Sequence, residues 1–241
     1  MKLRSLLIAF SSSATLLVGC GGGGVSGSPP SVSAAAAKNL PSAPGESAMA
    51  AYLQAAHKYA FKATNGGNSY TLHVSRVPNA GTTKFDGSAP AYSTLESVTL
   101  DENGLVIAAN SSTDYFLLSP YVPLGRVSGS GSPYGVVTSS SPLPATLDVG
   151  FSGDLESLTY YHDPTLSTVD GDEGVTYTVK ANNPTTLLFC LDSSVTNVTA
   201  QGTADDLVDD AEIDCYRVDA AGNSDLLSVT LTVNGRALTF E

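Results

Sequence analysis

Alternation of apolar and polar residues with period two, interrupted by short turn sequences, dominates the chain from residue 49 onward. The clearest turn is Asn234-Gly235, and Asn-Gly between alternating segments is the strongest two-residue hairpin signal in proteins. Similar patterns flank residues 65–68 and 101–104. We therefore predict strands near 58–64, 69–77, 93–100, 105–109, 212–218, 226–233 and 236–240, the last three of which form a meander.

One segment favours a helix instead. Residues 46–59 favour a helix, with one apolar face formed by Met49, Tyr52, Leu53, Ala56 and Tyr59. The chain has no Trp and only two Met, so a core must come from Val, Leu, Ile, Tyr and Phe. These patterns predict an all-β fold, either an antiparallel β-sandwich or a curved, barrel-like sheet, with one short N-terminal helix. In the strand at 226–233, the side chains expected to face the core are those of Leu227, Val229, Leu231 and Val233.

A short sequence occurs twice. Leu95-Glu96-Ser97-Val98-Thr99 recurs as Leu155-Glu156-Ser157-Leu158-Thr159. A duplication would give two tandem β-units with a seam near residues 128–133. The alternative is coincidence, since exposed strands draw on few residue types.

The N-terminal 20 residues have the layout of an export signal. Lys2 and Arg4 precede an apolar run, residues 6–18, which is shorter than the roughly 20 residues that a membrane-spanning helix requires. The run ends in Leu17-Val18-Gly19-Cys20, which resembles the lipobox of bacterial lipoproteins. In that family a diacylglycerol is attached to the cysteine and the chain is cut just before it. The resemblance covers residues 1–20 only; the alternative is an ordinary secretory signal that contains a cysteine.

The resemblance implies a domain plan and a location. Residues 1–19 would be a signal peptide, and residues 20–48 a lipidated cysteine followed by a flexible tether rich in Gly, Ser, Pro and Ala. Residues 49–241 would form the β-rich body. Gly21 stands where an aspartate favours retention at the inner membrane in this family, so we expect the cell outer membrane, at its periplasmic face or at the cell surface.

The charge of the chain restricts its partners. The full sequence has a formal net charge of −12, and loss of residues 1–19 would remove Lys2 and Arg4 and leave −14. Such a surface does not favour nucleic acid, and anionic lipid headgroups would repel it. Contact with the bilayer is therefore expected through acylated Cys20 alone.

Two cysteines remain if Cys20 carries lipid. Cys190 follows an apolar run and Cys215 lies in an expected strand. Because exported proteins pass through an oxidising compartment, we predict a disulfide between them. The alternative is a pair of buried thiols.

The sequence offers few candidates for chemistry. Asp170, Asp172 and Glu173 are weak calcium candidates, but neither they nor the acidic residues of 205–214 follow calcium-loop spacing. The favoured interpretation is solvated acidic loops. His57, His73 and His162 lack the paired spacing of a zinc site, and no Gly-x-Ser-x-Gly motif occurs. We therefore predict no catalytic residue, metal or cofactor.

Three functions remain open after these exclusions. The favoured one is a membrane-anchored cell-envelope lipoprotein that displays a non-catalytic β-domain to an unidentified protein or glycan. The first alternative is a periplasmic carrier of an apolar ligand, which needs a large apolar cavity. The second is a hydrolase with an unrecognised site, which needs a polar pocket where His, Asp or Ser groups converge.

Overall fold

The computed structural model describes residues 41–87, 90–233 and 236–241. Two helices lie in these ranges, α1 (Glu46–Leu53) and α2 (Ala200–Ala204). The strands are β1 (Ser42–Pro44), β2 (His57–Asn65), β3 (Asn68–Pro78), β4 (Tyr92–Glu102), β5 (Leu105–Leu118), β6 (Tyr121–Ser128), β7 (Tyr134–Ser140), β8 (Thr146–Asp148), β9 (Ser152–Tyr161), β10 (Val169–Asn183), β11 (Thr186–Thr196), β12 (Ala211–Asp219), β13 (Ser224–Val233) and β14 (Arg236–Phe240).

Twelve strands form one antiparallel sheet that curls into a nearly closed barrel. Their order is β14-β13-β12-β11-β10-β9-β7-β6-β5-β4-β3-β2. The two edge strands meet where Lys62 and Glu241 exchange backbone hydrogen bonds of 2.9 and 3.1 Å. The prediction of an all-β, barrel-like sheet is confirmed.

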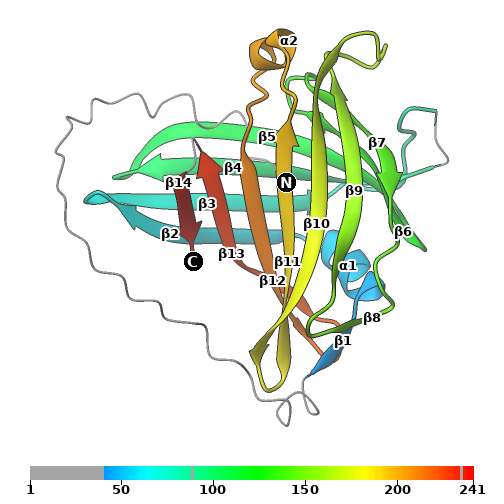
Figure 1. Ribbon diagram of the computed structural model, residues 1–241, viewed down its shortest axis with the longest axis vertical. Coiled ribbons are helices and arrows are strands. Elements are labelled where there is room, and N and C mark those ends of the chain that lie inside the picture. Colours follow the sequence, from blue (N-terminus) through cyan, green and yellow to red (C-terminus); the bar gives the residue numbers. More distant parts are fainter. Residues whose placement is uncertain (1–40, 88–89, 234–235) are drawn as a thin grey trace.

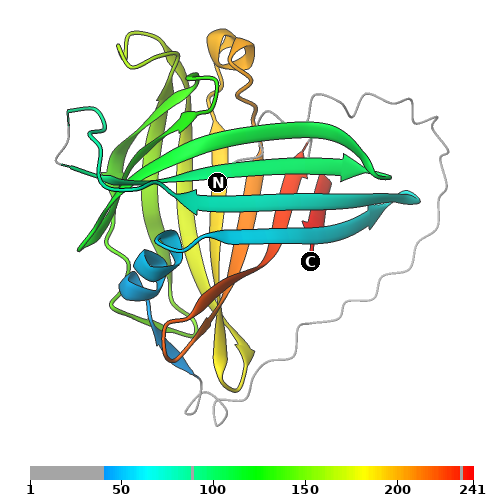
Figure 2. The same cartoon turned by 180° about the vertical axis from the view of Figure 1, so that it is seen from behind.

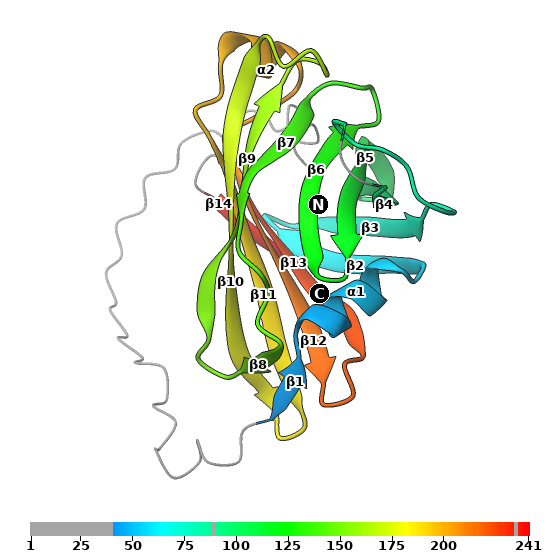
Figure 3. The same cartoon turned by 90° about the vertical axis from the view of Figure 1, so that its right-hand side faces the viewer.

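The barrel is flattened into two layers whose strands cross. In Figure 1, β2 to β5 run nearly horizontally and β9 to β12 nearly vertically, and Figure 2 shows the same crossing from behind. Figure 3 shows α1 and the β1–β8 pair at one end of the barrel and α2 at the other. The two ends therefore differ in what covers them.

Helix α1 closes its end of the barrel with apolar side chains. Met49, Tyr52 and Leu53 are buried in the main core. The buried hydroxyl of Thr94 on β4 donates to the carbonyl oxygen of Leu53 at 3.1 Å. The backbone N–H of Tyr121 donates to a carboxylate oxygen of Glu46 at 3.0 Å. These contacts fix the helix to the sheet.

Most expected elements are present, with three corrections to their boundaries. The helix expected at 46–59 ends at Leu53, because β2 already begins at His57. The folded part starts before residue 49, because β1 pairs with β8 and Ala43 and Ala48 are buried, so residues 42–48 do not belong to a tether. The expected seam at 128–133 joins β6 to β7, which pair with each other, and the sheet continues through it as one barrel.

The predicted inward face of β13 is wrong at one position. Val229 and Leu231 are buried as expected, but Leu226 is buried in place of Leu227, which is 37% exposed. The register between β12 and β13 shifts between Cys215 and Tyr216, and this irregularity reverses the alternation. The side chain of Val233 and the turn at 234–235 lie outside the described residues.

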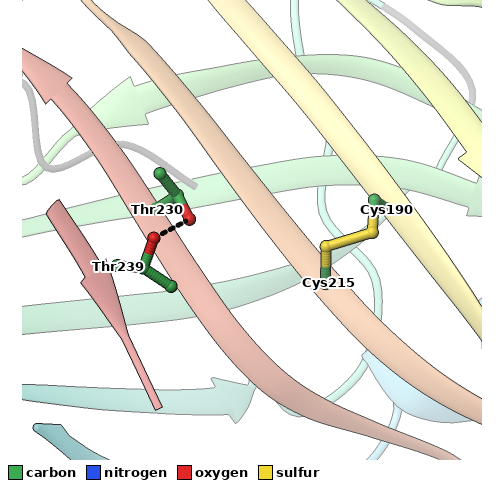
Figure 4. The surroundings of a disulfide bond; sticks show 4 residues. All are labelled: Cys190, Cys215, Thr230 and Thr239. Carbon is green, nitrogen blue, oxygen red and sulfur yellow. Dashed lines mark hydrogen bonds between the residues drawn. A yellow bond between two sulfur atoms is a disulfide. The ribbon is translucent and has the colours of Figure 1, made fainter. Parts of the chain in front are cut away.

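Cys190 and Cys215 are register partners on β11 and β12. Their sulfur atoms lie 2.09 Å apart, the distance of a disulfide bond, and their Cα atoms lie 4.1 Å apart. Figure 4 shows the bond between these neighbouring strands, near the hydrogen-bonded hydroxyls of Thr230 and Thr239. The predicted pair is therefore in bonding position.

Neither helix in the described part of the chain is long and apolar enough to cross a membrane.

Candidate functional site

The interior of the barrel contains a continuous group of charged side chains, which we call the interior belt. It comprises two guanidinium groups and six carboxyl groups, a formal excess of four negative charges if all are ionised. All but Asp114 and Arg126 are less than 10% exposed, and the side chains of those two are 17% and 12% exposed. The members are Arg76 (β3), Glu96 (β4), Asp114 (β5), Arg126 (β6), Glu156 (β9), Glu173 (β10), and Glu212 and Asp214 (β12).

The first ion pair of the belt joins neighbouring strands. Arg76 and Glu96 are register partners, and the guanidinium donates to one carboxylate oxygen through Nε, at 3.1 Å, and through Nη2. The same guanidinium lies over the ring of Tyr52 on α1, 5.5 Å from its centroid. Burial would lower the pKa of Arg76, but the combined effect of Glu96 and the surrounding tyrosines and Asp114 outweighs it and raises the pKa. The guanidinium therefore stays charged inside the barrel.

A second guanidinium lies among three carboxylates. Arg126 donates to Glu156 at 2.9 Å and lies 3.7 Å from both Asp114 and Glu173. Glu173 also accepts hydrogen bonds from the hydroxyls of Tyr160 at 2.5 Å and Ser193 at 2.8 Å. The belt thus continues across the sheet from β5 to β11.

A glycine makes this arrangement possible. Gly135 on β7 lies between Arg126 and Tyr160, and a Cβ atom there would come within 2.8 Å of the tyrosine ring. A real Cβ atom does not tolerate this distance, so any larger residue would displace Tyr160 and its bond to Glu173.

The belt ends at a pair of carboxyl groups on the inward face of β12. Glu212 and Asp214 lie two residues apart on β12, share its inward face and act on each other electrostatically. Burial raises the pKa of Asp214 to about 6, and burial together with Asp214 raises that of Glu212 well above its usual value. The inner pair therefore holds its protons more tightly than exposed carboxyl groups do.

A hollow of about 80 Å³ lies against the belt and is covered by Met49 and Leu53 of α1. A water molecule occupies about 30 Å³ in the liquid, so the hollow has room for only a few waters. Its wall contains both belt guanidiniums and most belt carboxyls, including Asp214. The wall of this space therefore combines acidic and basic groups with apolar side chains such as Phe116 and Leu158.

A second polar group lies at the opposite end, under α2. It comprises His162, Asp170, Gln201 and Asp205, and we call it the α2 cluster. Asp205 lies at the C-terminal end of α2 and contacts Nδ1 of His162 at 2.7 Å and Nε2 of Gln201 at 3.0 Å. Asp205 also acts on the charge of Asp170, which is 0% exposed beneath α2 and whose carboxylate oxygens accept no hydrogen bond from the described residues. The protein therefore contains a second pair of carboxyl groups that act on each other.

Beside this cluster lies a cleft of about 420 Å³ with a polar lining. Hydroxyl groups from β4, β5, the end of β6 and the β6–β7 connection form one side. Asp206, in the segment that follows α2, also contributes to the lining. Its hydroxyl residues are Ser97, Thr99, Ser111, Ser128, Ser130 and Ser132. Of the two spaces, only this one has room for part of an external ligand, and we regard it as the candidate binding site.

The structure separates the weak calcium candidates. Asp170 lies under α2, Asp172 accepts from Thr159 and from Asn197, and Glu173 points into the belt. Neighbouring residues on a strand point to opposite faces, so these three cannot share one ion. Among the described residues, no three His, Cys, Asp or Glu side chains are arranged to hold a metal.

The interpretation of the acidic segments as solvated loops is wrong for several residues. Asp170, Glu173, Glu212 and Asp214 are all buried. The signal was present, because Glu212, Asp214, Tyr216 and Val218 alternate with period two and so share the inward face of β12. The pattern alone did not predict their burial, because carboxyl groups are seldom buried unless they have partners. Here the partners come from strands that are distant in sequence.

The three histidines lie in three different places. His57 contacts the carbonyl oxygen of Tyr52 at 3.0 Å, and His73 contacts Asp101 at 3.2 Å on an exposed surface. His162 belongs to the α2 cluster. They form no common site.

Cys20, the predicted lipidation site, lies outside the described residues. Comparison of the chain with protein-family models, with curated proteins and with solved structures gave no match.

Proposed function

We propose that the protein is a cell-envelope lipoprotein, anchored to the outer membrane through Cys20, whose barrel displays a non-catalytic binding surface at the α2 end. The observation that carries this proposal is the packing of the interior. Apolar residues and the interior belt fill the barrel and leave a hollow of about 80 Å³. A partner of any size must therefore bind outside the barrel.

The position of the tether supports display at the α2 end. The described chain enters the fold through β1, beside α1, and α2 lies at the opposite end (Figure 3). An anchor at Cys20 would therefore attach near the α1 end and leave α2 and the polar cleft facing away from the bilayer. The hydroxyl lining of the cleft suits a polar, uncharged partner such as a glycan.

The packing favours this function over an apolar carrier. A fatty acyl chain requires an apolar channel, whereas the lining of this small hollow mixes apolar side chains with carboxyl and guanidinium groups whose desolvation such a ligand could not compensate. A hydrolase is the second candidate, because Glu212 and Asp214 form a carboxyl pair with raised pKa values on the hollow wall. The space beside them holds only a few waters, which is too little for a substrate.

Two measurements test the proposal. Mass spectrometry of the membrane-extracted protein should show loss of residues 1–19 and added lipid on Cys20, and a Cys20→Ala variant should appear in the soluble fraction. A Cys20→Ala variant that stays on the membrane with unchanged mass would refute the anchor. The soluble variant should also leave the fluorescence of cis-parinaric acid unchanged, and saturable binding of that fatty acid would favour the carrier.

A further inference from the structure

Helix α2 rests on an irregularity of the sheet. The register between β10 and β9 shifts between Val169 and Gly171, so Asp170 is the extra residue of a bulge. A bulge changes the direction of a side chain, and here the carboxyl group of Asp170 is buried beneath α2. The helix can approach this closely because residue 202 is glycine, where a Cβ would lie 2.1 Å from the carbonyl oxygen of Asp170.

Three kinds of contact hold α2 in place. The backbone N–H and the hydroxyl of Thr199 donate to the carbonyl oxygens of Asp170 and Val169, at 2.8 and 2.9 Å. Leu207 is 1% exposed and packs in a small apolar group with Tyr160. The third contact is the α2 cluster, the only one of these three that can gain or lose protons.

The charges that act on the cluster come from three segments. Asp205 and His162 act on Asp170, and Asp163, in the β9–β10 loop, acts on His162. Burial, assisted by Asp205, raises the pKa of Asp170 to about 6. Burial would raise the pKa of Asp205, but bonds from Gln201 and His162 outweigh it and the pKa is lowered. The hydrogen bond to Asp205 raises the pKa of His162.

We propose that α2 is a proton-controlled latch, docked on the barrel when Asp170 and His162 carry their protons and released when both protons are lost. In the protonated cluster, Asp170 is neutral, so its burial carries no charge, and the Asp205 carboxylate binds the imidazolium at 2.7 Å. The cluster then has no net charge. In the deprotonated cluster, two carboxylates face each other beside a neutral imidazole, and the net charge is −2.

The direction of the pH effect follows from the two groups. Both hold their proton more tightly when α2 is docked, so docking is favoured at low pH. The contribution of Asp170 to docking is lost as the pH rises through about 6. The contribution of His162 is lost at a pH above the usual pKa of histidine, because the pKa of His162 is raised in the docked state. Release would move Asp206, which contributes to the lining of the polar cleft. The cleft would therefore differ between acidic and neutral surroundings.

Amide hydrogen exchange on the full chain tests the latch. The N–H of Leu207 donates to the carbonyl oxygen of Gly202 at 2.8 Å, so its protection reports on α2. After correction for intrinsic exchange rates, we expect its protection factor to fall at least tenfold between pH 5 and pH 8. Amides in the centre of the sheet, such as that of Phe189, report global unfolding and should retain higher protection at both values.

Variants separate the two protons. Asp170→Asn keeps a donor towards Asp205 but cannot ionise, so the fall in the Leu207 protection factor between pH 5 and pH 8 should shrink. In Asp170→Asn/His162→Gln, which has neither titrating group, the fall should vanish. Asp192→Asn, an exposed site on β11, is the matched control and should behave as the wild type. Equal protection at both pH values in the wild type, or a full fall in the double variant, would overturn the proposal. If the double variant lost protection throughout the sheet, the single variant His162→Gln, at an exposed position, would replace it. This variant should reduce the fall in Leu207 protection between pH 5 and pH 8, and an undiminished fall would overturn the proposal.

Discussion

The two carboxyl pairs of this protein have the same chemistry but different supports. Glu212 and Asp214 lie on one strand, inside a sheet that continues on both sides of it. Asp170 and Asp205 come from a bulge and from the end of a five-residue helix. The inner pair cannot separate unless the barrel unfolds, whereas the outer pair separates if α2 undocks. Loss of a proton from the inner pair should therefore reduce the global stability of the barrel. Loss of a proton from the outer pair should instead weaken the docking of α2.

The cations near the two pairs also differ. Arg76 acts on Asp214 from the belt and stays charged over the accessible pH range. The cation of the outer pair is His162, whose side chain is 46% exposed and whose pKa is raised by its hydrogen bond to Asp205. A permanent cation suits a structural element, and a titrating one suits an element that moves.

The largest expected effect comes from removing the permanent cation. Arg76→Met would leave Glu96 buried without its partner and would remove the positive charge that acts on Asp214. Breaking a buried ion pair in this way costs about 3–5 kcal/mol in the free energy of unfolding, measurable by urea denaturation. Arg217→Met, at an exposed pair 2.9 Å from Asp225, should cost less than about 1 kcal/mol.

Equal losses in these two variants would contradict the role of the belt. If Arg76→Met failed to fold, Arg76→Met/Glu96→Leu should restore folding, because it removes the uncompensated charge as well.

The disulfide provides the next largest effect. It joins strands 25 residues apart in sequence, and the loop that it closes contains α2. Replacing both cysteines by serine should lower the free energy of unfolding by about 3 kcal/mol in the chain-entropy model. In this variant, the amide protection of α2 relative to that of the sheet should still depend on pH as it does in the wild type. A loss of that dependence would show that the two regions are coupled through the disulfide.

The pH dependence of global stability should reveal the inner pair. Because burial raises the pKa of Asp214 from 3.8 to about 6, the folded state holds this proton more tightly than the unfolded state. The stabilisation is complete below pH 4 and is lost as the pH rises through 6, a change of about 2–3 kcal/mol. Asp214→Asn should flatten this decline in denaturation curves between pH 5 and pH 8. If the stability of Asp214→Asn declined with pH as steeply as that of the control Asp192→Asn, Asp214 would be excluded as the source of the decline.

The smallest effect concerns the cap of α2. Thr199 accepts a hydrogen bond from the N–H of Gly202 at 3.0 Å and donates to Val169. Thr199→Ala should cost about 1 kcal/mol in docking of α2, seen as faster exchange of the Leu207 amide, with little change in urea denaturation. Thr203→Ala, in the same helix but outside the cap, should change exchange much less. A loss that appeared only in global stability would mean that α2 does not open separately.

The sequence predicted the barrel better than it predicted its contents. Turn residues and period-two alternation are local, so the hairpins were identified from residues adjacent in the chain. The belt depends on partners such as Arg126 and Glu173, which are far apart in sequence and meet only after closure. A period-two pattern marks a residue as inward, but it does not reveal that a buried glutamate will have an arginine opposite it.

The repeated pentapeptide was the signal nearest to the belt. Glu96 in the first copy and Glu156 in the second both point inward, and each binds one of the two belt arginines. Leu227 shows the opposite case, because the irregularity between Cys215 and Tyr216 left no mark in the sequence. The α2 cluster was hidden for a similar reason: Asp170 is turned towards α2 by a bulge.

The interior belt also restricts how the strands can align while the chain folds. Its eight charged residues lie on seven different strands. Their ion pairs and hydrogen bonds form only when each strand has one particular register against its neighbours. A slip by one residue would turn a charged side chain to the outside, and a slip by two would move it about 6–7 Å from its partner and leave it buried alone. Apolar side chains would tolerate the second error far better. The belt thus makes misaligned barrels unstable, and the assembled one is selected because both belt arginines meet their carboxylates in it.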